Sequence, residues 1–272
     1  MSFIKTLELL LISILLCSCI KTANIDKVII VKEIDFSGDV NTQVVSDILE
    51  DQVEFQNVNL ANWQEFPYQP MVRFKIAHNN NQIWLKFYVQ EEHILAHFTE
   101  TNSATHKDSC VEFFLDPKQN GNYYNFEFNC IGTTHLAYGP NRSNRQFLDP
   151  RLIDNKIQIE SSLGKLPFDE KTGRHSWEMT IIIPAEILVH ENGLKLKALK
   201  ANANFYKCGD KTSKPHYLSW NPVGTGNPDF YQPDYFGNLI FEYCMKTFRL
   251  FMTKRRKKHI IIDLIMCTCT YY

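Results

Sequence analysis

The sequence predicts an all-β protein, folded as a two-sheet antiparallel β-sandwich of immunoglobulin-like or jelly-roll-like form. Short segments of alternating apolar and polar residues recur along the chain, and turn-forming residues separate them. No segment of the body repeats its apolar residues with a sustained helical period. An apolar fraction of 44% over 272 residues is enough for the core of one large domain or two small ones. Together these features indicate a sandwich or barrel of short strands.

The elements are expected at regular intervals. A first edge strand is expected around 27–36, within the tether 19–43. Ser46 is a favourable N-cap residue for one or two helical turns, and 185–193 is expected to be a short helix at most. Asn residues at 79–81 indicate a turn. The other strands are expected at 71–78, 83–90, 108–116, 123–129, 135–139, 155–163, 175–184, 195–208, 216–220 and 237–243, with 135–139 and 155–163 forming a pair.

The first residues have the features of an export signal. Lys5 precedes an apolar run that is too short for a membrane span and ends in small or sulfur-containing residues. Residues 16–19, Leu-Cys-Ser-Cys, resemble the end of a bacterial lipoprotein signal, which predicts a signal peptide over 1–18 and lipidation of Cys19. The anchor would hold the exported protein on the outer membrane or elsewhere in the bacterial cell envelope. Cleavage without lipidation, which would release the protein, is the alternative.

The β-sandwich domain is expected over 44–243, and the tail 244–272 does not share its pattern. The tail holds seven Lys or Arg residues and one Asp, which leaves 22 of the 29 basic and 29 of the 30 acidic residues in the rest. Such an acidic body argues against nucleic acid as a partner, because binding to phosphates needs clustered Lys and Arg. The basic tail either lies on an anionic membrane surface or is an extension without a function.

The stretch 106–132 carries the most informative pattern. Side chains alternate between the faces of a strand, and opposed residues of an antiparallel pair share a face. Matching apolar to apolar residues predicts three cross-strand pairs, Val111–Phe128, Phe113–Phe126 and Leu115–Tyr124. The same register places Glu112 opposite Glu127, where the two carboxylates repel each other. A base, a metal ion, a shared proton or a bound ligand must therefore offset this repulsion.

Three of the eight cysteines, Cys110, Cys130 and Cys208, lie in the body of the chain. The register places Cys110 opposite Asn129 and Cys130 on the other face. A disulfide between Cys110 and Cys130 is therefore not expected. The odd number leaves at least one thiol free.

The alternation also predicts a sheet with one apolar face and one face of acids, amides, bases and aromatic rings. The second face is either a solvated surface with compensating ion pairs or a binding surface. Its mixture suits saccharides, because hydroxyl groups need polar partners and the C–H faces of a pyranose stack on aromatic rings. Phosphate-binding glycine loops, the HExxH and paired CxxC motifs of zinc sites and the serine-hydrolase elbow are absent from the sequence.

Seven segments stand in a specific order over about 63–243: DSCVEFFLD, NFEFNCIG, YGPNRSNR, SWEMTIIIP, ANFYKCGD, PHYLSW and NPDFYQPDYFGNLIF. Together they resemble the family 9 carbohydrate-binding modules, in the form found in exported proteins of gut-type Bacteroidota. The resemblance implies a two-sheet β-sandwich that binds sugars without catalysis, often at the reducing end of a chain, and that holds structural calcium.

The resemblance also implies a saccharide site. A Glu and an Asn of the family bind sugar hydroxyls, and Glu112 and Asn227 match them. Two tryptophans that sandwich a sugar ring in better-known members are replaced here by His106 and by Phe230, which Tyr231 follows.

Other candidates combine side-chain chemistry with the order of the motifs. Three long donors, Arg142, Arg145 and Lys207, can reach sugar hydroxyls or neutralise a carboxylate; the alternatives are solvated loop arginines and a Lys207–Asp210 ion pair. Three carboxylates at strand or loop ends are candidate ligands of a structural calcium ion: Asp108, Asp116 and Asp210. The expected partners are a mono- or oligosaccharide and, through the lipid anchor, a membrane.

The primary interpretation is non-catalytic carbohydrate binding by an exported, lipid-anchored protein that contributes to glycan capture or polysaccharide breakdown. Two alternatives stay open. Glu112 and Glu127 could act as the paired carboxylates of a glycoside hydrolase. The loss of both tryptophans is also consistent with a structural or partner-binding sandwich that has lost its sugar site.

Overall fold

The computed structural model describes residues 26–252 and 261–269, with side chains from 26 to 243. The expected signal peptide and the lipidation site Cys19 lie outside the described residues, so both stay predictions. Among the described residues, no helix is long and apolar enough to cross a bilayer.

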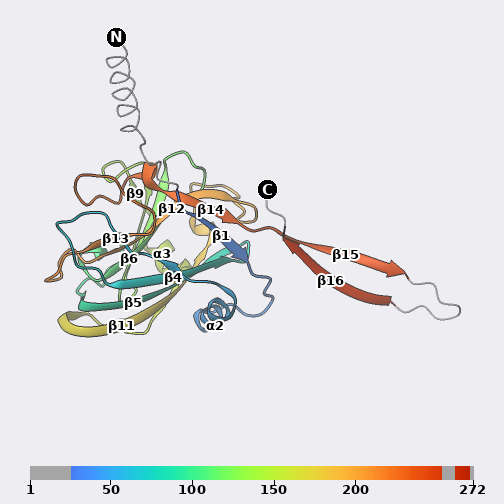
Figure 1. The fold of residues 1–272 in the computed structure, drawn as a ribbon, viewed down its shortest axis with the longest axis horizontal. Coiled ribbons are helices and arrows are strands. Elements are labelled where there is room, and N and C mark those ends of the chain that lie inside the picture. Colours follow the sequence, from blue (N-terminus) through green and yellow to red (C-terminus); the bar gives the residue numbers. More distant parts are fainter. Residues whose placement is uncertain (1–25, 253–260, 270–272) are drawn as a thin grey trace, which may run out of the picture.

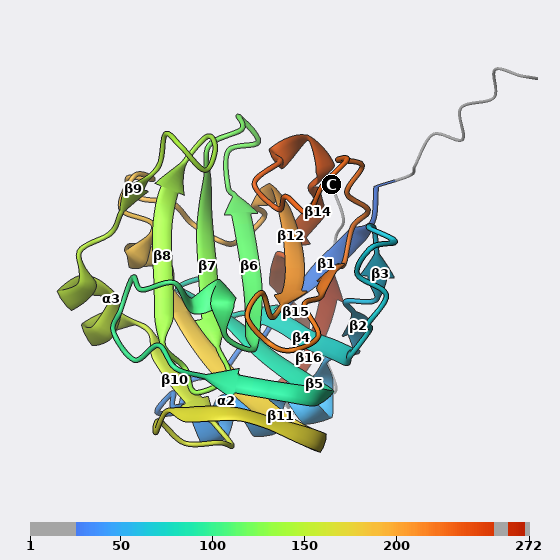
Figure 2. The ribbon, with the colours of Figure 1, turned by 90° about the vertical axis from the view of Figure 1, so that its left-hand side faces the viewer.

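Fourteen strands form one curled sheet that folds into two facing layers, which confirms the predicted β-sandwich (Figure 1; Figure 2). The first layer contains β2 (Gln56–Asn57), β4 (Met71–His78), β5 (Gln82–Ala96), β10 (Gln158–Ser161) and β11 (Phe168–Pro184). The second contains β3 (Leu60–Ala61), β6 (Cys110–Asp116), β7 (Tyr123–Asn129), β8 (Thr134–Gly139), β9 (Gln146–Phe147), β12 (Lys200–Cys208), β13 (Tyr217–Ser219) and β14 (Gly237–Phe241). Neighbouring strands within each layer are antiparallel.

Strand β1 (Val28–Glu33) joins the two layers. Its first part pairs in parallel with β14, and its last two residues pair in parallel with β4. The expectation of a first edge strand is therefore wrong, because β1 has partners on both sides. Its alternation fits this position, since Ile29 and Val31 are buried in the core while Val28 and Ile30 remain exposed.

Helix α2 (Thr42–Gln52) covers the outer face of the first layer (Figure 1). It is longer than expected and begins before Ser46, because Asn41 is the N-cap and its side chain accepts a hydrogen bond from the Val44 amide. Leu49 packs with Trp84 of β5 in a small apolar cluster. The helix thus buries a tryptophan that the strand alternation places outside the main core.

Helix α3 (Pro150–Lys156) was not expected. Asp149 caps it, and Pro150 occupies the first turn, where a missing N–H is tolerated. The expected pairing of 135–139 with 155–163 is wrong, because β8 pairs with β7 and β9 whereas β10 pairs with β11 in the other layer. The expected short helix at 185–193 is a single 3₁₀ turn, η3 (Ala185–Ile187). Two further 3₁₀ turns are η2 (Thr105–Lys107) and η4 (Pro233–Tyr235).

Strands β6 and β7 pair in the predicted register. All three apolar pairs form, Glu112 is opposite Glu127, and Cys110 is opposite Asn129. The three cysteines of the body are free thiols, as expected for Cys110 and Cys130. Both faces of these strands are buried, however, with Glu112 2% and Glu127 0% exposed. The alternative of a solvated outer surface is therefore wrong here.

Apolar side chains from both layers meet in one core. Phe74 of β4 stacks on Phe205 of β12 with ring centroids 3.9 Å apart, and Phe113 of β6 stacks on the same ring at 4.8 Å. All three rings are fully buried. Burying one such side chain stabilises the fold by about 1.5–3 kcal/mol. The Phe74–Phe205 stack joins the two layers, and the Phe113–Phe205 stack joins neighbouring strands of the second layer.

A charged pair lies within this core. Lys207 Nζ of β12 is 2.9 Å from Glu91 Oε2 of β5, and both side chains are 0% exposed. The Nε1 of Trp177 donates to Glu91 Oε1 over 2.7 Å. Burial, and then the charge of Lys207, lower the pKa of His216 well below 6.5. The neutral His216 ring therefore accepts from Lys207 through Nε2, at 2.9 Å.

The tail forms a separate two-stranded antiparallel sheet, β15 (Cys244–Met252) and β16 (Ile261–Cys269). This hairpin projects from the sandwich in Figure 1. Whether the tail lies on a membrane surface or has no function stays a prediction.

We predict that Lys207→Met lowers the free energy of unfolding by about 3–5 kcal/mol, because it leaves the buried carboxylate of Glu91 without its counter-charge. Urea denaturation followed by tryptophan fluorescence measures this change. The control is Lys156→Met, which breaks an ion pair with Glu186 whose two side chains are 41% and 62% exposed; it should cost no more than about 1 kcal/mol. Equal effects of the two substitutions would contradict the prediction.

Candidate functional site

A cavity of about 130 Å³ opens on the outer face of the second layer. Its walls come from six places: turn η2, β6, the loop between β8 and β9, the end of β12 with the turn after it, β13, and the loop that precedes η4. The lining residues are His106, Glu112, Arg142, Cys208, Asp210, Tyr217, Pro228, Phe230 and Tyr231. The cavity therefore collects side chains from segments that are far apart in the sequence.

A row of polar side chains crosses four strands beneath the cavity. Tyr206 of β12 is opposite Glu112 of β6, which is opposite Glu127 of β7, which is opposite His135 of β8. Opposed residues share a face of the sheet, so the register alone places both carboxyl groups on the side of the cavity.

Glu127 is the fully partnered member of the carboxyl pair. Oε1 accepts from Tyr231 Oη at 2.7 Å and from Asn125 Nδ2 at 2.9 Å, and Oε2 accepts from Thr105 Oγ1 at 3.2 Å. Burial alone would raise the pKa of Glu127. The neighbouring His135 and the hydrogen bonds from His106 and Tyr231 outweigh burial and lower this pKa to about 2. Glu127 is therefore ionised at neutral pH.

Glu112 is the under-partnered member. Its Oε1 accepts from Cys208 Sγ at 3.1 Å, whereas Oε2 is buried without any hydrogen-bond partner. Burial, and then the charge of Glu127, raise the pKa of Glu112 well above 4.5. The two facing carboxyl groups thus differ in charge: Glu127 holds the negative charge, and Glu112 keeps its proton.

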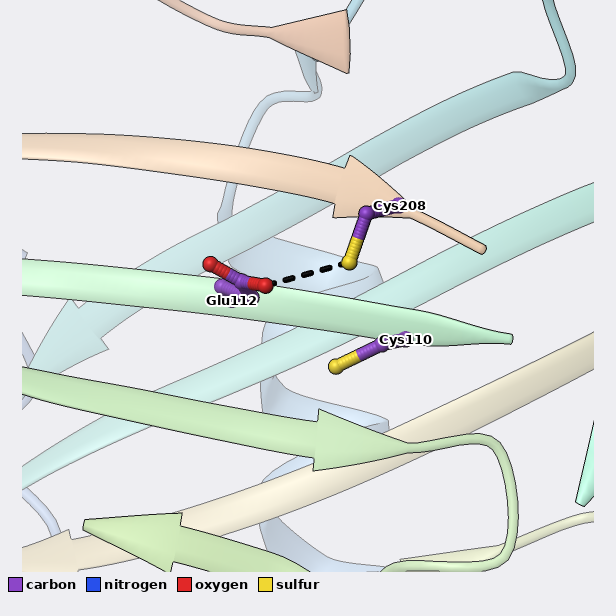
Figure 3. A group of neighbouring side chains, drawn as sticks. All are labelled: Cys110, Glu112 and Cys208. Atoms are coloured by element: carbon purple, nitrogen blue, oxygen red, sulfur yellow. Dashed lines mark hydrogen bonds between the residues drawn. The ribbon is translucent and has the colours of Figure 1, made fainter. Parts of the chain in front are cut away.

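Two thiols adjoin Glu112. Figure 3 shows Cys110 and Glu112 on β6 and Cys208 on the neighbouring β12, with the sulfur of Cys208 directed at the carboxyl group. The three ligand-type atoms lie within 4.8 Å of one another. Burial raises the pKa of Cys110 to about 12 and that of Cys208 well above 9. Both thiols are therefore protonated, and the group beside the cavity is neutral.

Aromatic rings and arginines form the opposite wall. One face of Phe230 is covered by Tyr206, with ring centroids 4.1 Å apart and an interplanar angle of 11°. The guanidinium groups of Arg142 and Arg145 lie 4.2 and 4.4 Å from the ring centroid of Tyr231. Arg142 also contacts Asp229 at 3.4 Å. The wall thus offers hydrogen-bond donors next to rings.

Five of the eight predicted binding residues line this cavity: His106, Glu112, Arg142, Phe230 and Tyr231. Arg145 lies behind them, against Tyr231. Asn227 is exposed and does not line the cavity, although its neighbour Pro228 does.

Lys207 is not part of the site. It pairs with Val111 across β12 and β6, and Val111 points into the core between the layers. Its ammonium group therefore binds Glu91, and neither a saccharide nor Asp210 is within its reach. The prediction for Lys207 is wrong because its side chain points into the core. The sequence of β12 alone does not show which strand it pairs with, so this orientation was missed.

The three predicted calcium ligands do not form one site. Asp108 accepts hydrogen bonds from the amides of His97 and Phe98, and Asp116 accepts from the amides of two residues in the following turn. Only Asp210 lines the cavity. The group Cys110, Glu112 and Cys208 is the one cluster of metal-ligating side chains found within the described residues. Calcium binding by any of these three Asp residues stays a prediction.

Two lining residues, Cys208 and Tyr217, were missed as binding residues. Cys208 reaches the cavity because β12 places it opposite Cys110, a long-range pairing that gives no local signal. Tyr217 lies on β13, whose alternation in HYLSW puts Tyr217 and Ser219 on one face. That alternation was the available signal for Tyr217.

Comparisons with known proteins give a consistent result. The model of carbohydrate-binding family 9 matches residues 43–241. A crystal structure from Bacteroides uniformis ATCC 8492, of a protein whose carbohydrate binding is itself proposed, is 35% identical; it covers 80% of this chain and 100% of its own, with a TM-score of 0.77. No curated protein gives a significant match.

Two structures of a family 9 module from Caldicellulosiruptor kristjanssonii share the fold. One is a complex with glucose, with 16% identity over 80% of this chain and 96% of that one. The other is a complex with cellotriose, with 17% identity over 79% and 93%. The TM-score is 0.50 in both cases.

Substitution of the two facing carboxyl groups should change stability in opposite directions. A carboxyl group whose pKa is raised in the folded state makes the protein less stable as pH rises above 4.5, which is the pKa of that group in the unfolded chain. Glu112→Gln should therefore stabilise the protein at pH 7 by about 1–3 kcal/mol, and the gain should vanish near pH 4.5. Glu127, whose pKa is lowered, contributes stability to the folded protein that is fully present above pH 4.5 and is lost as the pH falls toward 2. Glu127→Gln should destabilise the protein at pH 7 by about 2–4 kcal/mol.

Urea denaturation of the three proteins at pH 5 and pH 7.5 measures both effects. The exposed Glu186→Gln is the control and should change stability by less than about 0.5 kcal/mol. A loss of stability in Glu112→Gln at pH 7.5 would show that Glu112 is ionised in the folded protein.

Proposed function

Because this chain belongs to carbohydrate-binding family 9, we propose that it binds a saccharide without catalysis in the cavity beside Glu112. The observation that carries the proposal is that Glu112 lines a cavity while its buried Oε2 has no hydrogen-bond partner. A buried polar atom without a partner costs about 1–3 kcal/mol. A ligand hydroxyl at this atom would remove that cost.

The surrounding groups suit a pyranose. A protonated Glu112 can donate one hydrogen bond and accept another, and sugar hydroxyls do the same. Asp210, whose pKa burial raises, and His106 add further polar contacts at the rim. Arg142 supplies donors, while Phe230 and Tyr231 supply the apolar ring edges that C–H groups contact.

The related module from C. kristjanssonii binds glucose and cellotriose. We extend this ligand class to the present chain as the first to test: glucose and β-linked gluco-oligosaccharides. His106 and Phe230 stand at the positions of the two expected tryptophans, and Tyr206 covers a face of Phe230. The sugar is therefore expected to be held more by hydrogen bonds than by a sandwich of two rings.

The alternative of a glycoside hydrolase is not favoured by the geometry. Both catalytic carboxyl groups of such an enzyme must reach the scissile bond. Glu127 does not line the cavity, because Tyr231 donates to it and covers it. The hydrogen bonds to Glu127 stabilise its charge beside Glu112, so the facing carboxyl pair needs no catalytic role to account for it.

Export and lipid anchoring at Cys19 complete the proposed function. They are supported by the Leu-Cys-Ser-Cys sequence at 16–19 and by a relative from a Bacteroides species. The anchor would hold the sandwich at the bacterial envelope, where captured glycan is passed to enzymes or transporters.

Isothermal titration of the protein with glucose and cello-oligosaccharides, with calcium present, should give dissociation constants in the micromolar to millimolar range. Glu112→Ala should weaken binding at least about tenfold, which corresponds to 1.4 kcal/mol. The control Glu186→Ala, in an exposed turn of the other layer, should bind as the unchanged protein does. Thermal unfolding of each variant checks that it is folded. Absence of binding to a broad panel of saccharides would leave a structural or partner-binding sandwich as the better account.

Expression of the full chain in a Gram-negative host tests the anchor. The protein should fractionate with membranes and incorporate labelled fatty acid, and Cys19→Ala should abolish both. Cys17→Ala is the matched control and should leave both unchanged. Labelling that survives in Cys19→Ala would contradict the proposed attachment site.

A further inference from the structure

Phe147 is a large apolar side chain left exposed at the edge of the second layer. It lies on β9, the last strand of the sheet order, and is 58% exposed. Because the apolar ring faces water, it contributes less to the core than a buried phenylalanine and is available to a ligand.

The strand register places Phe147 on the same face as the cavity. Phe147 is opposite Ala137 of β8, Ala137 is opposite Asn125 of β7, and Asn125 is opposite Phe114 of β6. Phe114 follows Glu112 by two residues, so both share one face of β6. Phe114 also packs in the aromatic cluster that contains Phe230 and Tyr231.

Two polar side chains connect the exposed ring to the cavity wall. The guanidinium of Arg145 lies 4.4 Å from the ring centroid of Tyr231 and 5.7 Å from that of Phe147. Its Nη1 atom is buried without a hydrogen-bond partner. The ring of His135 meets Phe147 edge-on at 5.0 Å, and its Nε2 is 3.9 Å from Glu127.

We propose that Phe147 and Arg145 form a second saccharide subsite, so that the site takes an oligosaccharide that extends from the cavity toward the β9 edge. The C–H face of a sugar unit stacks on Phe147, and a hydroxyl of that unit accepts from the guanidinium of Arg145, which lies between Phe147 and Tyr231. Ala137 and Asn125, between the two positions, are buried, so the ligand passes over the arginines that cover this part of the sheet. This inference rests on the proposed saccharide binding at Glu112.

The spacing of the strands fixes the ligand length that this subsite needs. Three strand spacings separate β6 from β9, which is about 15 Å at 4.7–4.9 Å per spacing. A single pyranose held at Glu112 cannot span that distance. Phe147 therefore distinguishes oligosaccharides from monosaccharides.

The test compares glucose with cellotriose and cellotetraose by isothermal titration of the full domain and its variants. In the unchanged protein, the oligosaccharides should bind more tightly than glucose. Phe147→Ala should weaken oligosaccharide binding about tenfold and change glucose affinity less than about twofold. Leu166→Ala, which removes a side chain that is 80% exposed outside this surface, is the control and should change neither affinity.

The outcomes separate the two proposals. If the unchanged protein binds no saccharide, the proposed function fails. If it binds glucose and the oligosaccharides with equal affinity, or if Phe147→Ala leaves oligosaccharide binding unchanged, only the second subsite is overturned. Arg145→Lys keeps the charge but loses the planar guanidinium with its several donors, and it should lower oligosaccharide affinity in the same selective way.

Discussion

The organisation of this protein depends on two carboxyl groups held face to face in a buried place. Glu112 and Glu127 are direct partners across β6 and β7, and a low dielectric makes two adjacent negative charges expensive. The fold resolves the conflict by unequal partnership: Glu127 receives the hydrogen bonds and keeps the charge, and Glu112 receives one weak thiol donor and keeps a proton. Glu112, the member of the pair with an unpartnered oxygen, is also the one that lines the cavity.

The second layer has a different environment on each side. Its inner face contributes Phe113 and Phe205 to the apolar core, and its outer face lies beneath turn η2 and the loop before η4. The outer face is therefore buried, although it mixes polar groups with aromatic rings. Such a surface keeps polar side chains in fixed positions, which reduces the entropy that a ligand must remove on binding.

Local patterns predicted the fold class, most strands and the register of β6 with β7, because apolar alternation and turn residues are properties of neighbouring residues. The same register placed Glu112 and Glu127 together. Long-range pairing was not accessible. Lys207 looked like a free donor, although the pairing of β12 with β6 places it on the core side of the sheet. Strand β1 looked like an edge strand, although it pairs with both β14 and β4.

Strand β1 has a mechanical consequence if the chain is anchored through Cys19, as proposed. A pull along β1 acts parallel to the strand, and so it shears the hydrogen bonds to β14 and β4 together instead of opening them one by one. The two layers share this strand, and neither can be peeled away while the other stays intact. Strand β1 would thus detach as one unit, at a load that its hydrogen bonds to β14 and β4 resist at once.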